Sequence, residues 1–513
     1  MADVSSRIAS RRARTDLLDP VLGVFNRRYE DEAAEAAARL DAAAAAGEDT
    51  GPLHGLAVAV KDLIATREAP VTGHSRVNDP AWYAGADAPL VARLRRAGAV
   101  VVGSTTLAEH ALGRPDPELG LVVPRNPWDP DRYPGGSSSG SAAGLPDGLF
   151  DVGLGTDTGG SIRIPAALCG VTGIKPTPGL VPVDGVLPLA RSLDTVGTLS
   201  RSVREGAETL AVLAGREPGG LTWQDPAGPV RIGVPERALA ESGQLSEGCG
   251  TAFDGALEEL RGLGAELVPV ELPELYPLFA AQVITLLAEA YEVHQAALAG
   301  RWAQYGRPFR RTVVLGGLIS ASTYVRAQRV RAWAAAGMRR RFAGLAAVAT
   351  PAWPGVAPRY DDVEGLGAIS WLPGLWSGVG FPAIALPMGF EGGLPVSLQL
   401  AGLPGSDFAL AGLADAYQRR SGWHVRRPRR GPAPALDLEP AAALAPAPAG
   451  GWAVPGVAAG VEGAADGEAG RRLLAGLREL GVEVGGAELD ALCGQWALTS
   501  MLFGFLPDPL PGG

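Results

Sequence analysis

Lysine is the scarcest charged residue of this sequence. Lysine and arginine together number 45, yet only Lys61 and Lys175 are lysines. An arginine stays protonated at physiological pH, whereas a lysine removed from water can lose its proton and act as a base. Because the chain uses arginine wherever a soluble cation suffices, a retained lysine indicates a task that a guanidinium group cannot perform. We expect such a task for Lys61 and favour a packing role for Lys175.

Cysteine is also scarce. Cys169, Cys249 and Cys493 are far apart and form no CxxC pair, so neither a zinc cluster nor a disulfide framework is predicted. A reduced, cytoplasmic setting is the simplest interpretation. The sequence also has no HExxH, no P-loop and no GxGxxG after a strand. We therefore expect no metal and no cofactor.

A surplus of positive charge is missing as well, since the formal net charge is −10. This argues against an extended nucleic-acid surface, which relies on clustered cations. Residues 365–390 carry no charge and are numerous enough to cross a bilayer. Their prolines and glycines would break a spanning helix, so we interpret the segment as buried loop and short strand. Neither nucleic acid nor an integral membrane position is expected, and a homodimer is left open.

The order of apolar segments indicates an α/β fold. Residues 18–47 have the spacing of a helix, and the apolar run 56–60 reads as a strand that leads into Lys61. A helix, a glycine and another strand follow. Residues 202–345 are mainly helical in pattern, whereas 346–425 have strand and loop character and close with a helix near 407–420.

Two clusters of glycine and serine carry the chemistry. The first reads GGSSSG and contains Ser137, and the second reads TDTGGS and ends at Ser161. In the second, Gly159 and Gly160 allow consecutive backbone N–H groups to converge on an anion. Such a nest beside a serine hydroxyl is typical of an oxyanion hole, and the alternative is a plain glycine-rich turn.

A nucleophilic serine needs a group that takes its proton. Lys61 follows an apolar strand, so its ammonium group should be partly desolvated and its pKa lowered. A neutral Lys61 could deprotonate one serine, which in turn deprotonates another. A histidine triad assembled in space stays open, although no recognisable triad motif contains any of the five histidines: His54, His74, His110, His294 and His424.

The first cluster also fits GxSxG, the nucleophile elbow of α/β-hydrolases. That elbow requires a strand immediately before it. The residues that precede Gly136 here, RNPWDPDRYPG, contain three prolines and read as a loop. We therefore discard the elbow.

Taken together, these motifs resemble the amidase signature family. GLAVAVKD, NPWDPDRYPGGSSSGSAAG and GLGTDTGGSIRIPAALCGVTGIKPT match its characteristic blocks in order, including the 24-residue step from Ser137 to Ser161. The likeness extends over roughly residues 18–428. It implies the amidase signature fold, in which helices cover both sides of a mixed central β-sheet.

The resemblance also implies a role for each matching residue. Ser161 would be the acyl-forming nucleophile, Ser137 a bridging serine held by a cis peptide bond, and Lys61 the general base and later acid. The oxyanion hole would be formed by the backbone N–H groups of four consecutive residues: Thr158, Gly159, Gly160 and Ser161.

Further residues would support this machinery. Asp157 and Arg163 would fix the loop around Ser161, and Ser138 would assist the hydrogen-bond network. Lys175 matches a position regarded as structural in the family. No metal and no cofactor is implied.

The predicted activity is hydrolysis of a small carboxylic amide to an acid and an amine or ammonia through an acyl-enzyme on Ser161. One alternative is the glutamine-hydrolysing subunit of an aminoacyl-tRNA amidotransferase. Others are a biosynthetic member that transfers the acyl group to an amine, an enzyme for urea-type substrates, and a catalytically dead binding protein. The retention of all three catalytic residues argues against the last.

The composition changes after residue 428. Residues 431–451 form a Pro/Ala-rich linker, and two amphipathic helices are predicted beyond it. We therefore divide the chain into an amidase signature catalytic domain (1–430), the linker, and a small helical C-terminal extension of unknown role (452–513). The extension is too short for a robust core of its own and should dock on the main body or on a partner.

Overall fold

The computed structural model of the chain describes residues 3–223, 225, 228, 230–362, 371–429, 468–480, 482, 484 and 486–507. The predicted linker, 431–451, lies outside these described residues, so the division into domains stays a prediction. No helix of the described part is long and apolar enough to cross a membrane.

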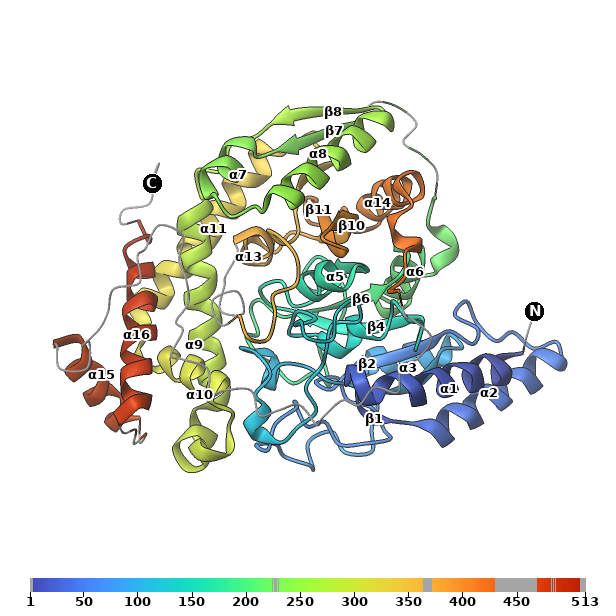
Figure 1. Cartoon of the computed structure of the whole chain (residues 1–513), viewed down its shortest axis with the longest axis horizontal. Coiled ribbons are helices and arrows are strands. Elements are labelled where there is room, and N and C mark those ends of the chain that lie inside the picture. The colour runs from blue at the N-terminus through green and yellow to red at the C-terminus, as the bar shows by residue number, and fades with distance from the viewer. Residues whose placement is uncertain are drawn as a thin grey trace.

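A single mixed sheet runs through the centre of the described structure (Figure 1). Its eleven strands follow the order β1-β3-β2-β4-β6-β5-β10-β11-β9-β7-β8. The strands are β1 (Phe25–Arg28), β2 (Ala57–Lys61), β3 (Val100–Thr105), β4 (Val152–Asp157), β5 (Thr172–Lys175), β6 (Thr195–Ser200), β7 (Val230–Val234), β8 (Ala265–Pro269), β9 (Ala347–Pro351), β10 (Ala383–Glu391) and β11 (Leu394–Ala401).

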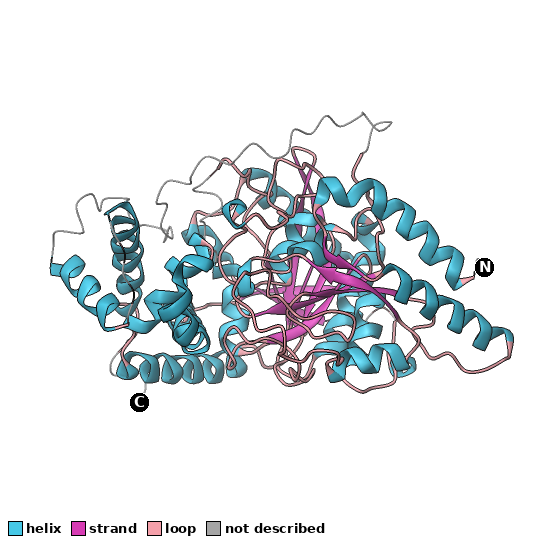
Figure 2. Ribbon diagram, turned by 90° about the horizontal axis from the view of Figure 1, so that it is seen from below, coloured by secondary structure: helices cyan, strands magenta, loops and turns pink. Residues whose placement is uncertain are grey.

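Helices cover both sides of this sheet (Figure 2), which confirms the predicted fold class. They are α1 (Val4–Leu22), α2 (Glu30–Ala45), α3 (Pro89–Arg96), α4 (Ser139–Ala143), α5 (Arg163–Cys169), α6 (Val203–Leu213), α7 (Glu236–Ser242), α8 (Glu247–Gly262), α9 (Leu275–Arg301), α10 (Arg307–Val313), α11 (Ala321–Arg341), α13 (Trp371–Val379), α14 (Asp407–Ser421), α15 (Glu468–Glu479) and α16 (Gly486–Phe503).

The centre of the sheet positions the site. Strand β2 is AVAVK, and all five residues are buried, as expected for a strand covered on both faces. It runs parallel to its neighbours β3 and β4. The carboxyl ends of these strands therefore meet at one edge, which is where open α/β sheets bind ligands.

Three expectations from the sequence are wrong in detail. Residues 18–47 are not one helix: α1 ends at Leu22, Gly23 follows at φ +58°, and β1 pairs with β3 before α2 begins. The mainly helical stretch 202–345 also contains the parallel pair β7 and β8. These are short edge strands, and the apolar and alanine-rich helices around them masked their period.

The uncharged segment 365–390 was expected to be loop and short strand. Its described part contains helix α13 followed by strand β10. Pro373 is the third residue of α13, where the backbone N–H has no intrahelical partner, so this proline does not break the helix. Residues 363–370 lie outside the described part.

The two predicted C-terminal helices are present as α15 and α16, and both pack on the main body. Leu473, Leu477 and Leu492 form one buried cluster with Val314 and Leu315, which lie beyond α10. Arg310 on α10 forms an ion pair with Glu488 at 2.8 Å. The extension therefore docks in cis on the helices at one end of the sheet (Figure 1).

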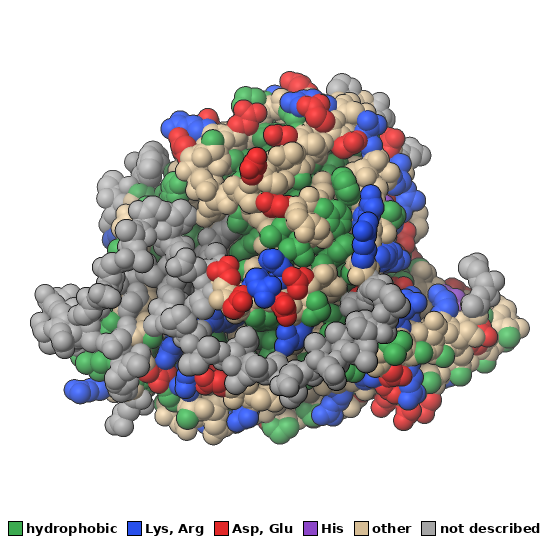
Figure 3. Space-filling model, viewed as in Figure 1, with side chains coloured by type: hydrophobic (Ala, Val, Ile, Leu, Met, Phe, Trp, Pro, Cys, Tyr) green, Lys and Arg blue, Asp and Glu red, His purple; other side chains and the backbone are tan. Residues whose placement is uncertain are grey.

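The surface over these elements is mixed in charge. Figure 3 shows acidic and basic side chains interspersed on the face seen in Figure 1. Two isolated exposed apolar side chains, Leu17 and Val425, accompany them elsewhere. Scattered residues of this kind are normal on a protein surface and need no functional explanation.

Candidate active site

Lys61 is the last residue of β2, and its side chain is completely buried. Its Nζ donates hydrogen bonds to Ser137 Oγ at 2.7 Å and to Thr156 Oγ1 at 2.8 Å. Thr156 belongs to the adjacent parallel strand β4. The packing of β2 against β4 therefore delivers a lysine amine to two hydroxyl groups at the same edge of the sheet.

Burial lowers the pKa of Lys61 from its ordinary value of 10.5 to about 7. The negative charges of Asp194 and Asp157 oppose this effect by favouring the ammonium form. An amine with such a pKa is in part neutral at physiological pH, and its lone pair can then accept a proton. The lowered pKa that the sequence predicted for Lys61 is present.

Ser137 lies in the loop that leads into α4, and the peptide bond from Gly136 to Ser137 is cis, as the family resemblance implied. Position 136 must be glycine because a Cβ there would lie only 2.1 Å from the Tyr133 hydroxyl oxygen. Ser138 Oγ accepts a hydrogen bond from the Thr156 backbone N–H at 3.3 Å. The loop is therefore tied to strand β4 next to the Lys61 contact.

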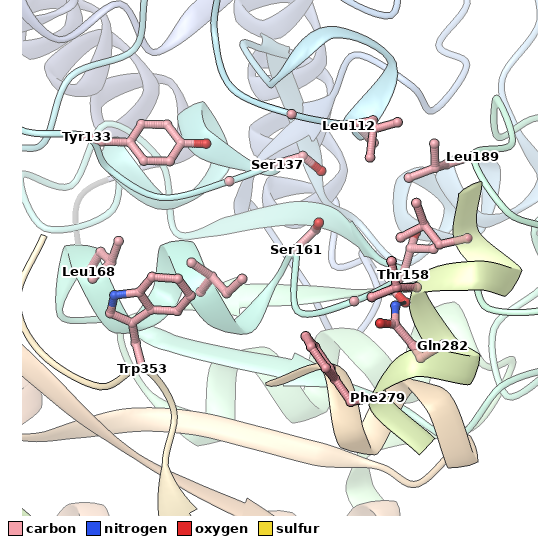
Figure 4. A pocket seen from close by; sticks show the side chains of 18 of the residues that line it. Leu112, Tyr133, Ser137, Thr158, Ser161, Leu168, Leu189, Phe279, Gln282 and Trp353 are labelled. Atoms are coloured by element: carbon pink, nitrogen blue, oxygen red, sulfur yellow. Dashed lines mark hydrogen bonds between the residues drawn. The ribbon is translucent and has the colours of Figure 1, made fainter. Parts of the chain in front are cut away.

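Ser161 follows β4 in the second glycine-rich cluster. Figure 4 shows the hydroxyl groups of Ser137 and Ser161 pointing toward each other across the same pocket. Gly160 adopts φ +123°, a conformation that residues with a side chain rarely reach, and a Cβ there would also press on Pro373 of α13 at 2.6 Å. Glycine at this position lets the chain turn tightly enough to present Ser161.

One predicted oxyanion-hole donor has another partner. The Gly160 N–H donates to Asp157 Oδ1 at 2.8 Å. In this structure that donor is engaged, which departs from the predicted set of four. The assignment of Thr158, Gly159 and Ser161 to an oxyanion hole stays a prediction.

Asp157 and Arg163 form a buried ion pair that brackets the Ser161 loop. Arg163 donates from Nε and Nη2 to the two Asp157 oxygens at 3.0 and 2.9 Å, and both side chains are fully buried. Burial alone would raise the pKa of Asp157, but the charge of Arg163 outweighs it and lowers that pKa to about 2. Arg163 also donates to Gln399 Oε1 and Ser377 Oγ, each at 2.7 Å.

A cavity of about 200 Å³ opens onto the two serines. Its polar lining includes Tyr133, Thr158 and Gln282, and Gln282 reaches in from α9 (Figure 4). None of the described residues that line it is charged, and none of the five histidines is among them. The other large side chains of its wall are apolar: Leu112, Leu189, Phe279, Val283, Leu286 and Trp353.

The sequence missed several residues of this site. Thr156 stood out only as the first residue of TDTGGS, and its contact with Lys61 depends on the pairing of β2 with β4. Asp194 and Gln282 come from a loop and a helix distant in sequence, so no local motif could reveal them. Trp371 and Trp376, considered as an acyl-pocket wall, are buried in the main core instead.

The family comparison identifies the scaffold. A family model described as Amidase matches residues 8–411 of this chain. A crystal structure of an amidase superimposes with a TM-score of 0.75 at 31% identity, covering 82% of this chain and 97% of that one.

Curated relatives point to one activity within that scaffold. A glutamyl-tRNA(Gln) amidotransferase subunit from Chloroflexus aurantiacus is 35% identical, over 81% of this chain and 93% of its own length. The crystal structure of the glutamyl-tRNA(Gln) amidotransferase subunit from Thermotoga maritima gives a TM-score of 0.66 at 29% identity, covering 81% of this chain and 91% of that one. These names correspond to the alternative left open above rather than to the hydrolysis of a small amide.

Proposed function

Because this chain belongs to the amidase signature family, we propose that it cleaves a carboxylic amide through an acyl-enzyme on Ser161. The contact that carries this proposal is the 2.7 Å hydrogen bond between Lys61 Nζ and Ser137 Oγ. A buried amine that can be neutral at physiological pH then lies one hydroxyl away from the nucleophile.

The proton route follows from this arrangement. Neutral Lys61 takes the Ser137 proton while Ser137 takes that of Ser161, and Ser161 Oγ forms a bond to the amide carbonyl carbon. When the carbon–nitrogen bond breaks, the proton returns through Ser137 to the leaving nitrogen. Water then attacks the acyl-enzyme along the same route and restores Ser161.

The developing oxyanion needs donors that are fixed before the reaction. We assign this role to backbone N–H groups of Thr158, Gly159 and Ser161. The ion pair of Asp157 with Arg163 holds the loop in place, since Asp157 also accepts the Gly160 and Ile162 N–H groups at 2.8 and 3.2 Å. Loss of one donor from such a hole typically costs about 3 kcal/mol of transition-state stabilisation.

The pocket wall favours a neutral, apolar acyl group. Free glutamine carries an α-ammonium and an α-carboxylate, and burying either charge without a partner is costly. The described lining offers no charged side chain to pair with them. We therefore favour an amide of an apolar acid as the substrate over glutamine.

The glutamine-hydrolysing activity is retained as the second candidate because the curated relatives carry that name at 35% identity. The two candidates differ in what the purified chain does alone. We expect kcat/KM for neutral aryl and alkyl amides to exceed that for L-glutamine by at least about 100-fold, the discrimination expected when two buried charges stay unpaired.

The experiment is a panel of such amides and L-glutamine, with Ser161→Ala as the control. Glutaminase activity equal to or above the best neutral amide would favour the second candidate, and co-purification with other subunits would strengthen it. Product analysis with added amines separates hydrolysis from acyl transfer. Turnover by the Ser161→Ala variant would contradict the acyl-enzyme itself.

A further inference from the structure

Asp194 lies immediately before β6 and holds two parts of the pocket together. Its Oδ1 accepts a hydrogen bond from Thr158 Oγ1 at 2.5 Å. Its Oδ2 accepts the backbone N–H groups of Leu189 and Ala190 at 2.9 and 3.0 Å. Thr158 and Leu189 both line the cavity, so one carboxylate connects the nucleophile loop to the opposite wall.

Thr158 is held from a second side. Gln282 Nε2 donates to the Thr158 backbone carbonyl at 3.4 Å from helix α9. The Thr158 side chain is therefore oriented by Asp194 and its backbone by Gln282. An N–H group that must stabilise a transient oxyanion benefits from such fixation, because no reorganisation is then needed during the reaction.

The charge of Asp194 is also unusual for this site. Two carboxylates act on Lys61, namely Asp194 and Asp157. Asp157 is paired with Arg163 and is also influenced by Lys175. Among the described residues, no lysine or arginine lies within ion-pair distance of Asp194, and Lys61 is the cation whose charge acts on it. Asp194 is thus the carboxylate that can respond when Lys61 becomes an ammonium.

We infer that Asp194 is a positioning residue of the reaction proposed above: it fixes Thr158 and stabilises the ammonium that Lys61 forms when it takes the Ser137 proton. The inference rests on the proposed function for its catalytic meaning. Its electrostatic part concerns Lys61 alone and can be measured without turnover.

The test compares Asp194→Asn, which removes the charge, with Asp194→Glu, which keeps it, because both disturb the local packing. The full-length protein is labelled with ¹³C and ¹⁵N at lysine, and only two side chains, Lys61 and Lys175, then give signals. Lys175→Met assigns them. We expect the Lys61 titration midpoint to fall by roughly one pH unit in Asp194→Asn and to change little in Asp194→Glu.

The same variants are assayed for kcat/KM against pH with a neutral amide. The acidic limb should move to lower pH in Asp194→Asn, and the plateau should fall about tenfold because a less basic amine is a weaker base. Thr158→Val should lower the plateau without moving the limb. Equal midpoints in Asp194→Asn and Asp194→Glu would overturn the electrostatic half, and an unchanged plateau in Thr158→Val would overturn the fixation.

The two proposals can fail separately. If the wild-type protein cleaves no amide but the Lys61 midpoint responds to Asp194→Asn as expected, the proposed function fails and the electrostatic link stands. If the wild type is active and the midpoint does not move, the inference about Asp194 fails alone. Should Asp194→Asn not fold, the Thr158→Val plateau still decides the fixation, and a midpoint shift in Asp194→Glu would count against the charge.

Discussion

The two lysines of this chain have nearly the same environment and different contacts. Lys61 ends β2 and Lys175 ends β5 of the same sheet. Both side chains are fully buried, and burial lowers the pKa of each to about 7. Lys61 Nζ reaches the hydroxyls of Ser137 and Thr156, whereas Lys175 Nζ donates to the Pro176 carbonyl at 2.8 Å. A lowered pKa makes a base available, but only a hydroxyl partner gives it a proton to take.

The largest difference should appear in activity. Lys61→Met should lower kcat/KM by about 10³- to 10⁴-fold, the contribution typical of a general base. Lys175→Met, a matched change that keeps the chain length and apolar stem, should stay within about tenfold of wild type. Steady-state kinetics on one neutral amide measures both. Equal losses in the two variants would remove the distinction between the lysines.

The next effect concerns the ion pair between them. Arg163→Met leaves the fully buried Asp157 without its main partner, and such a loss costs about 3 to 5 kcal/mol of unfolding free energy. Lys175 is the cation that then remains near Asp157. The double variant Arg163→Met/Lys175→Met should therefore lose more than the sum of the single losses in chemical denaturation. Strict additivity would show that Lys175 does not act on Asp157.

A smaller effect should be shared by both lysines. Each has a pKa of about 7 when folded and 10.5 ordinarily, so between these values the unfolded chain binds more protons. The free energy of unfolding should therefore rise with pH across this window, with a contribution on the order of 1 kcal/mol per pH unit from each lysine. Denaturation of wild type and the two Met variants between pH 7 and 9.5 checks this. A slope unchanged in either variant would mean that its lysine is not neutral in the folded state.

The smallest expected effect is that of Thr156→Val. Thr156 contacts Lys61 without lying on the proton route, so its loss should cost about tenfold in kcat by misdirecting the amine. Ser137→Ala, which interrupts the route, is the control and should cost far more. If Thr156→Val were as damaging as Ser137→Ala, the relay would have to be reassigned to Thr156.

The chemistry of this site could be predicted because it lies in local motifs. The scarcity of lysine drew attention to Lys61, and the two glycine-serine clusters supplied Ser137 and Ser161 with their spacing. The amidase signature fold followed from the same blocks. Glycine and serine in such dense clusters have few structural reasons to recur, so the motifs were informative without a structure.

The remaining features depend on tertiary contacts. The Thr156 and Asp194 contacts arise only once β2, β4 and β6 are paired, and no residue pattern along the chain encodes them. The break after Leu22 and the edge strands β7 and β8 were missed because alanine-rich flanks carry a strong helical period. Helix α13 was misjudged because its proline lies in the first turn, where proline is harmless.

The most direct test of the central claim is the rate at which a fluorophosphonate acylating probe labels Ser161, measured against pH in wild type and Lys61→Met. If Lys61 activates Ser161 through Ser137, the wild-type rate rises through a midpoint near pH 7 to a plateau. The Lys61→Met rate is then at least about 10³-fold lower and shows no such midpoint. Labelling of Lys61→Met at the wild-type rate, or a wild-type profile without an inflection near pH 7, would contradict the account.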